Sequence, residues 1–161
     1  MKKVYINLVL LSSIALCNNI VTMQKTPVQL DIELHEILNR LYIRPATYNI
    51  IKDLILNGAN ANTKNRFGNN ALVIATYAGN IDMVNFLISH GADVNSKDSN
   101  GNPVLIIATK KRNIDIVESL INSGANIDAK GRYGANALQI AEMTGSRDIK
   151  RLLEEHTTEK N

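Results

Sequence analysis

The sequence predicts an all-α repeat protein, a solenoid of about four units of 33 residues with degenerate units at both ends. Two sets of glycines and one set of leucines recur at this interval: Gly58, Gly91 and Gly124; Gly68, Gly101 and Gly134; Leu54, Leu87, Leu120 and Leu153. No insertion breaks the register. Because one such unit cannot bury its apolar face alone, we expect neighbouring units to stack around a continuous core.

The first unit, residues 31–62, keeps only the second half of the repeated pattern. We expect helices over 31–42 and 47–57. The break falls near Arg44-Pro45, because the residue before a proline avoids the helical region. This unit is predicted to cap the N-terminal end of the stack.

The unit at 65–97 shows the full pattern. Residues 70–78 predict a short inner helix, and residues 81–88 predict a second helix with one apolar face. Gly79 and Gly91 are predicted to end these two helices, since glycine readily adopts the left-handed conformation. The turn-rich stretches around Gly68 and Gly101 predict tight hairpin loops between units.

The units at 98–130 and 131–155 repeat this order. Asn80 and Asn113 are predicted N-caps of second helices. Arg112 occupies the position of Gly79, so we predict a left-handed arginine there at a cost of about 1 kcal/mol. The last unit carries Lys150 and Glu154 at apolar positions, as a C-terminal cap needs. Residues 156–161 are predicted to be a disordered tail.

The glycine-led segments share a motif. It reads Gly68-Asn-Asn-Ala-Leu-Val-Ile-Ala75, Gly101-Asn-Pro-Val-Leu-Ile-Ile-Ala108 and Gly134-Ala-Asn-Ala-Leu-Gln-Ile-Ala141. With the Gly-Ala-x-x-Asn/Asp segments, these resemble ankyrin repeats over about residues 31–155. The resemblance implies a stack of helix-turn-helix-hairpin units that binds a protein partner.

The motif departs from the ankyrin pattern at two positions. The threonine is replaced by Asn70, Pro103 and Asn136, and the histidine by Val73, Ile106 and Gln139. The hydrogen bonds that these two residues make in the family are therefore not expected. The asparagines at 70 and 136 can still cap their helices.

The N-terminal sequence predicts a targeting segment rather than a folded element. Residues 1–17 combine a positive start with the apolar run Val4–Cys17, which is too short to span a membrane and is typical of a secretory signal peptide. We expect cleavage after Cys17, followed by a linker over 18–30. Two alternatives remain: a lipoprotein signal, which Ile14-Ala15-Leu16-Cys17 resembles except at Leu16, and an uncleaved anchor or packed helix.

Composition narrows the possible functions. The chain is 45% hydrophobic and carries a net charge of +3. Without Lys2 and Lys3 the balance is 16 basic against 15 acidic residues, or +1, which argues against binding to nucleic acid. The single cysteine excludes an internal disulfide. The abundance of Asn, Ile and Lys suits a bacterium with an AT-rich genome.

The sequence offers no catalytic or metal-binding constellation. His35, His90 and His156 lie on different units, and His90 is expected to meet the negative end of a helix. The glycines follow helices rather than precede them, so they form no phosphate loop. We therefore predict no enzyme activity and no cofactor.

The sequence therefore predicts a monomeric, exported module that recognises a protein partner through its surface. The candidate residues lie on the loop tips and at the ends of the inner helices: Arg66, Phe67, Asn69, Tyr77, Ser99, Asn100, Asn102, Lys110, Lys111, Arg132 and Tyr133. An aromatic residue beside an arginine is typical of a binding hot spot, although Phe67 and Tyr133 could instead brace neighbouring loops. The partner is an unknown protein, and no membrane contact is expected unless Cys17 is lipidated. A secreted, host-directed effector and a periplasmic or lipid-anchored accessory or inhibitor of an enzyme are the alternatives.

Overall fold

The computed structural model describes residues 25–39 and 45–158. Eight helices fill this part of the chain: α2 (Pro27–Leu38), α3 (Pro45–Leu56), α4 (Ala71–Ala78), α5 (Ile81–Ser89), α6 (Val104–Lys110), α7 (Ile114–Asn122), α8 (Ala137–Met143) and α9 (Arg147–Thr158). The described residues contain no strand, only isolated bridges across the loops at Lys64–Asn70 and Lys97–Pro103.

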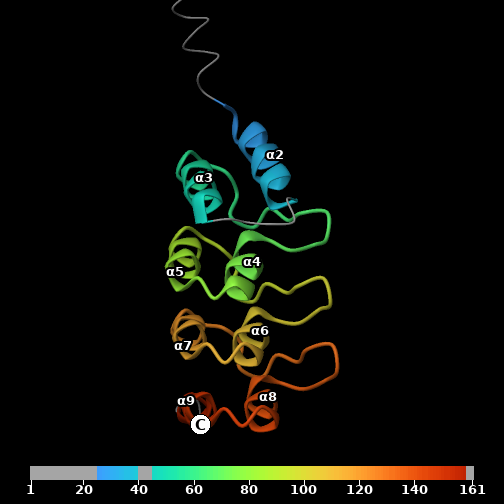
Figure 1. The fold of residues 1–161 in the computed structure, drawn as a ribbon, viewed down its shortest axis with the longest axis vertical. Helices are drawn as coiled ribbons and strands as arrows, with labels where there is room; N and C mark the ends of the chain where they lie inside the picture. The colour runs from blue at the N-terminus through green and yellow to red at the C-terminus, as the bar shows by residue number, and fades with distance from the viewer. Residues whose placement is uncertain (1–24, 40–44, 159–161) are drawn as a thin grey trace, which may run out of the picture.

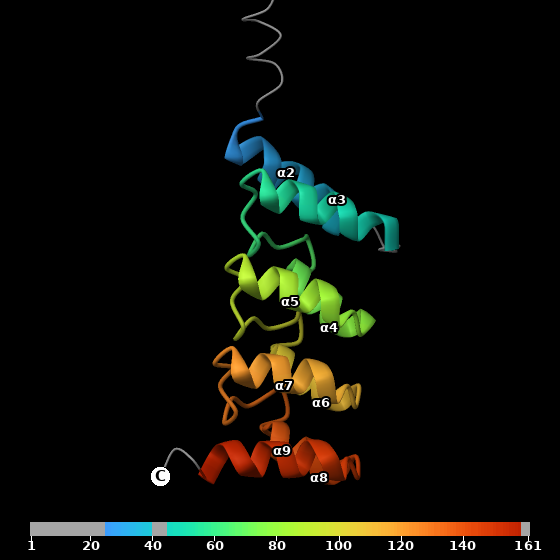
Figure 2. The ribbon, with the colours of Figure 1, turned by 90° about the vertical axis from the view of Figure 1, so that its left-hand side faces the viewer.

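The helices form two parallel columns. Figure 1 shows the inner helices α4, α6 and α8 in one column and α3, α5, α7 and α9 in the other, with three loops projecting on the side of the inner column. Turned by 90°, the pairs lie above one another as layers (Figure 2). The all-α solenoid predicted from the 33-residue period is confirmed.

Asparagine side chains cap α4, α5, α7 and α8 as predicted, whereas α6 follows Pro103 and has no side-chain cap. Asn70, Asn80, Asn113 and Asn136 each accept a hydrogen bond from the backbone N–H three residues further on. Each bond satisfies one of the donors that a helix N-terminus leaves free. Gly79 ends α4 in the left-handed conformation, with φ 70°.

The core runs without interruption through the layers. The leucine ladder at 54, 87, 120 and 153 is buried, as are Ala75, Ala108 and Ala141, whose small side chains let the inner helices approach. Helix α6 is buried over 104–109, because it has a neighbouring layer on each side. Stacking therefore provides the burial that one unit cannot reach alone.

The N-terminal helix differs from its predicted position. Helix α2 begins at Pro27 and ends at Leu38, whereas a helix over 31–42 and a linker over 18–30 were predicted. The reason is local: Thr26 and Gln29 form a capping box, and Pro27 sits in the first turn, where its missing N–H costs nothing. The predicted signal peptide, residues 1–17, lies outside the described residues.

The C-terminal helix also extends beyond its predicted end. Helix α9 continues to Thr158, so residues 156–158 of the predicted tail are helical. Two side chains support the last turn: His156 Nδ1 bonds to the carbonyl of Leu152 at 2.9 Å, and the Thr157 hydroxyl donates to the carbonyl of Leu153 at 2.7 Å. Residues 159–161 lie outside the described part.

Candidate protein-binding surface

Side-chain hydrogen bonds inside the hairpin loops shape their tips. In the loop at 63–70, Asn65 Oδ1 accepts from the N–H groups of Phe67 and Asn69, both at 3.0 Å. In the loop at 96–103, Asp98 Oδ1 accepts from the N–H groups of Asn100 and Asn102 at 2.9 and 2.8 Å. Such bonds from backbone N–H groups to an Asn or Asp side chain hold a tight turn in one conformation. The loop at 129–136 has Gly131 at this position.

Further asparagines tie each loop to the next. Asn39 Oδ1 accepts from the Arg66 N–H at 2.8 Å. Asn69 Oδ1 accepts from the Ser99 N–H at 2.9 Å, and Asn102 Oδ1 from the Arg132 N–H at 3.2 Å. The tips are therefore held as one row.

This row changes the roles of two candidate residues. Asn102 is 9% exposed, and its amide nitrogen also donates to Asp98. Asn69 is half-buried and bonded to the following loop. We conclude that both side chains brace the loops. The sequence of a single unit does not predict this role, because the bonded backbone groups belong to the next unit. The remaining candidates are exposed: Arg66, Phe67, Tyr77, Ser99, Asn100, Lys110, Lys111, Arg132 and Tyr133.

The first and third tips each present an arginine against an aromatic ring. The Arg66 guanidinium lies 4.7 Å from the centre of the Phe67 ring, and the Arg132 guanidinium 5.8 Å from that of Tyr133. Tyr133 is 85% exposed and Phe67 47%. Arg132 Nη1 also donates to Asn100 Oδ1 at 2.9 Å, which links it to the middle tip. Both rings are therefore exposed on loops that asparagine side chains also brace.

Tyr77 connects the end of α4 to the middle loop. Its hydroxyl donates to Asp98 Oδ2 at 2.5 Å, and Lys111 Nζ lies 5.9 Å from its ring centre. Burial, the hydrogen bond and the charge of Asp98 together raise the pKa of Tyr77 to about 12. Burial alone would raise the pKa of Asp98, but the hydrogen bonds from Tyr77, Asn102 and Asn100 outweigh it and lower that pKa. The Tyr77 hydroxyl is thus engaged, whereas its ring is partly exposed.

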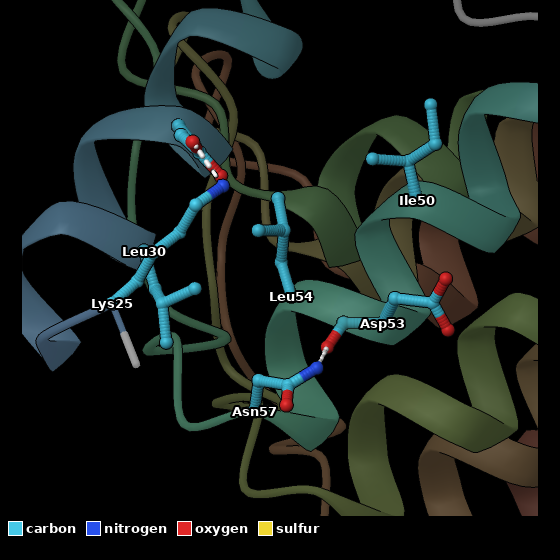
Figure 3. A pocket seen from close by; sticks show the side chains of 7 residues that line it. Lys25, Leu30, Ile50, Asp53, Leu54 and Asn57 are labelled. Carbon is cyan, nitrogen blue, oxygen red and sulfur yellow. Dashed lines mark hydrogen bonds and ion pairs between the residues drawn. The ribbon is translucent and has the colours of Figure 1, made fainter. Parts of the chain in front are cut away.

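A pocket of about 560 Å³ lies between α2 and α3, at the end of the stack (Figure 3). It is lined by Lys25, Leu30, Glu33, Ile50, Asp53, Leu54 and Asn57. Lys25 forms an ion pair with Glu33 at 2.5 Å, and the Asn57 side chain donates to the carbonyl of Asp53. The pocket is lined by this ion pair and by aliphatic side chains, and none of its lining residues is a histidine or a cysteine.

The histidines serve local structure. Each bonds through Nδ1 to a backbone carbonyl: His35 to Lys64 at 2.7 Å, His90 to Phe86 at 2.7 Å and His156 to Leu152 at 2.9 Å. The contact of His90 with the end of α5 confirms its predicted position at a helix terminus. Over 25–39 and 45–158, no three His, Cys, Asp or Glu side chains gather so that they could hold a metal ion. Within the same ranges, no helix has the length and apolar character needed to span a membrane.

Three exposed lysines were not among the predicted surface residues. Lys64, Lys97 and Lys130 each precede a loop tip, are exposed and recur at the 33-residue step. The period that revealed the glycines could have revealed them too. Asp98 was also missed, because its partner Tyr77 belongs to another unit.

Stacked helix pairs with braced, projecting loops define a repeat protein of the binding-scaffold class. The family model of ankyrin repeats, in three copies, matches residues 43–131. The chain therefore belongs to the ankyrin repeat family, whose members generally mediate protein–protein interaction and are typically non-catalytic. A comparison with curated proteins finds no match.

Proposed function

We propose that this protein is an exported, non-catalytic module that binds one protein partner through its loop tips and the adjoining ends of the inner helices. The observation that carries the proposal is the pair of exposed Arg–aromatic tips on loops that are already braced. Aromatic and arginine side chains dominate the energy of many protein interfaces. Within residues 25–39 and 45–158, the first and third tips each expose an arginine beside an aromatic ring.

Rigidity supports the same proposal. The hydrogen bonds that Asn69 and Asn102 accept from the Ser99 and Arg132 N–H groups hold neighbouring tips in one arrangement before a partner arrives. A surface that is ordered in advance loses less conformational entropy on binding. A partner that contacts two or three tips at once would gain most from this order.

Export is proposed from the N-terminal sequence alone. Lys2, Lys3 and the apolar run Val4–Cys17 have the layout of a secretory signal. Within this proposal the protein acts as a monomer, in the periplasm or outside the cell. A host-directed effector and a lipid-anchored accessory or inhibitor of an enzyme are variants that differ in location and partner.

The intact mass of the protein from its native cells tests the export step. A mature chain that begins near Asn18 would support export, and a lipid-sized increment on Cys17 would support the anchored variant. A full-length chain in the cytosol would contradict both.

The binding step is tested on the tips. A partner captured by the full chain is titrated against the wild type and against Phe67→Ser/Tyr133→Ser. We expect at least about tenfold weaker binding, with a melting temperature within about 2 °C of the wild type, because both rings are exposed. Val28→Ser/Ile32→Ser, which removes exposed apolar area at the end of the stack, is the control and should bind normally. Early unfolding with unchanged affinity would show that the rings are structural.

A further inference from the structure

Charged side chains are sorted between the loops and the two middle helices of the outer column, α5 and α7. The outer segments 80–95 and 113–128, which contain α5 and α7 with the turns that follow them, carry acidic residues and no lysine or arginine: Asp82, Asp93, Asp115, Glu118 and Asp128. The loops at 63–70, 96–103 and 129–136 carry the opposite charge: Lys64, Arg66, Lys97, Lys130 and Arg132. Figure 1 places these loops on the side away from α5 and α7.

The one acidic residue within these three loops does not neutralise them. Asp98 is 6% exposed, and its carboxylate accepts hydrogen bonds from Tyr77, Asn100 and Asn102. It therefore stays beneath the surface. The basic groups above it dominate the field that a partner meets on this side.

Three lysines form the regular part of this charge. Lys64, Lys97 and Lys130, which we call the lysine row, occupy the same position in successive loops and are exposed. Among the described residues, none of the three has an ion-pair partner within 4.0 Å; the ion pairs there involve Lys25, Lys150 and Arg151. The row is free to bind carboxylates.

We propose that the lysine row binds an acidic, extended segment of the partner protein, laid along the stack across successive loops. This inference rests on the proposed function and specifies the chemistry of the partner. Packed helices lie about 8–10 Å apart, and an extended chain advances about 3.3 Å per residue. Carboxylates at every third residue would therefore meet successive lysines, while neighbouring apolar side chains could cover Phe67 and Tyr133.

The charge distribution favours a polypeptide over nucleic acid. Duplex DNA carries one negative charge per about 1.7 Å of its axis, so proteins that bind it need an excess of positive charge over a wide area. Here 18 basic residues are nearly balanced by 15 acidic ones, and the acidic outer segments would repel a polyanion that extended past the loops. Spaced carboxylates on a peptide match single lysines one repeat apart.

The test uses a fluorescent peptide with Glu at every third position and small or aromatic residues between. Its binding to the full chain is followed by anisotropy at low salt, and amide shifts in ¹⁵N spectra locate the site. We expect Lys64→Gln/Lys97→Gln/Lys130→Gln to weaken binding about tenfold, since three exposed ion pairs are lost. Salt should weaken binding of the wild type more than that of this variant.

The matched control removes the same amount of charge from the other column of helices. Lys52→Gln/Arg147→Gln/Arg151→Gln lies on α3 and α9 and should change affinity less than about twofold. An equal loss in both variants would overturn the proposal in favour of net charge. Tighter binding of a labelled oligothymidine than of the peptide would also overturn it. Equal binding of a peptide with all its Glu residues at one end would overturn the spacing argument.

The two proposals can fail separately. Suppose that the captured partner loses affinity with Phe67→Ser/Tyr133→Ser but not with the triple lysine variant. The proposed function then stands, and the acidic segment is wrong. If the acidic peptide binds the lysine row while the tip variant leaves partner binding unchanged, the proposed hot spot is wrong.

Discussion

The interior of the stack and its N-terminal end are built from similar amphipathic helices but differ in what covers them. In the interior, α6 is buried over 104–109, between neighbouring layers. At the N-terminal end, α2 leaves Val28 68% exposed and α3 leaves Ile50 49% exposed. The comparison teaches that burial in this fold depends on the neighbouring layer as well as on the pattern of the helix itself.

The largest test of this difference is a truncation in the core. Leu87, on α5, is fully buried, so Leu87→Ala should lower the free energy of unfolding by about 2–5 kcal/mol. The matched change Ile50→Ala on the exposed end should cost less than about 1 kcal/mol. Urea unfolding followed by circular dichroism measures both. Equal costs would contradict the difference between interior and end.

Removal of a helix cap should likewise lower the free energy of unfolding more in the interior than near an end of the stack. Asn70 is 1% exposed, accepts from the Val73 N–H and donates to the Ser96 hydroxyl at 2.8 Å. Asn70→Ala leaves buried polar groups unpaired and should cost about 2 kcal/mol. Asn136 makes the equivalent cap in a more exposed layer, so Asn136→Ala should cost about 1 kcal/mol. Thermal unfolding should rank the two variants in this order.

The turn at Arg112 is a strained point inside the stack. Arg112 has φ 57°, the left-handed conformation predicted from its position, and is the one non-glycine residue with positive φ in the described part of the chain. Arg112→Gly should stabilise the protein by about 0.5–1 kcal/mol, because glycine adopts this conformation without a steric cost.

The matched change tests the same turn in the last layer. Gly145 has φ 66°, and the space that an alanine Cβ would occupy there is open, so Gly145→Ala should cost about 1 kcal/mol through conformation alone. Differential scanning calorimetry can compare the two variants. A destabilised Arg112→Gly would show that the arginine side chain contributes more than its backbone conformation costs.

The smallest expected effect is on the pH dependence of the free energy of unfolding. The folded state lowers the pKa of Asp98, so its contribution is present above the ordinary pKa of aspartate and is lost as the pH falls toward the lower, folded value. Asp98→Asn should flatten the dependence of stability on pH in this acidic range, and Tyr77→Phe, which removes one donor, should flatten it partly. Chemical unfolding at a series of pH values measures this slope. An unchanged slope in both variants would contradict the assigned hydrogen bonds.

At the basic end the sign reverses for Tyr77. Its folded pKa of about 12 lies above the ordinary value of 10.0, so this contribution is present below pH 10 and is lost as the pH rises toward 12. Burial also raises the pKa of Tyr48, so phenolate absorbance should show more than one tyrosine that titrates late. Tyr77→Phe should remove the Tyr77 part of this late signal and leave the rest.

Much of the fold could be predicted from the sequence because its signals are local. A capping asparagine such as Asn113 acts on a donor three residues away, and a glycine such as Gly79 ends its own helix. The misplaced start of α2 was also a local signal, since Thr26, Pro27 and Gln29 are close together in the chain. Arg66, Phe67, Arg132 and Tyr133 lie on exposed tips, and their role in binding a partner stays a prediction.

By itself, the sequence determined the repeat, the helix boundaries of the interior units and the position of the left-handed turn at Arg112. Tertiary structure alone decided which side chains remain available. Asn102 and Tyr77 were predicted to be available to a partner, yet each forms a hydrogen bond with a residue that stacking brings near: Arg132 and Asp98, respectively. The physical reason is that a cap or turn is satisfied within a few residues, whereas burial and the bonds between loops depend on the next layer.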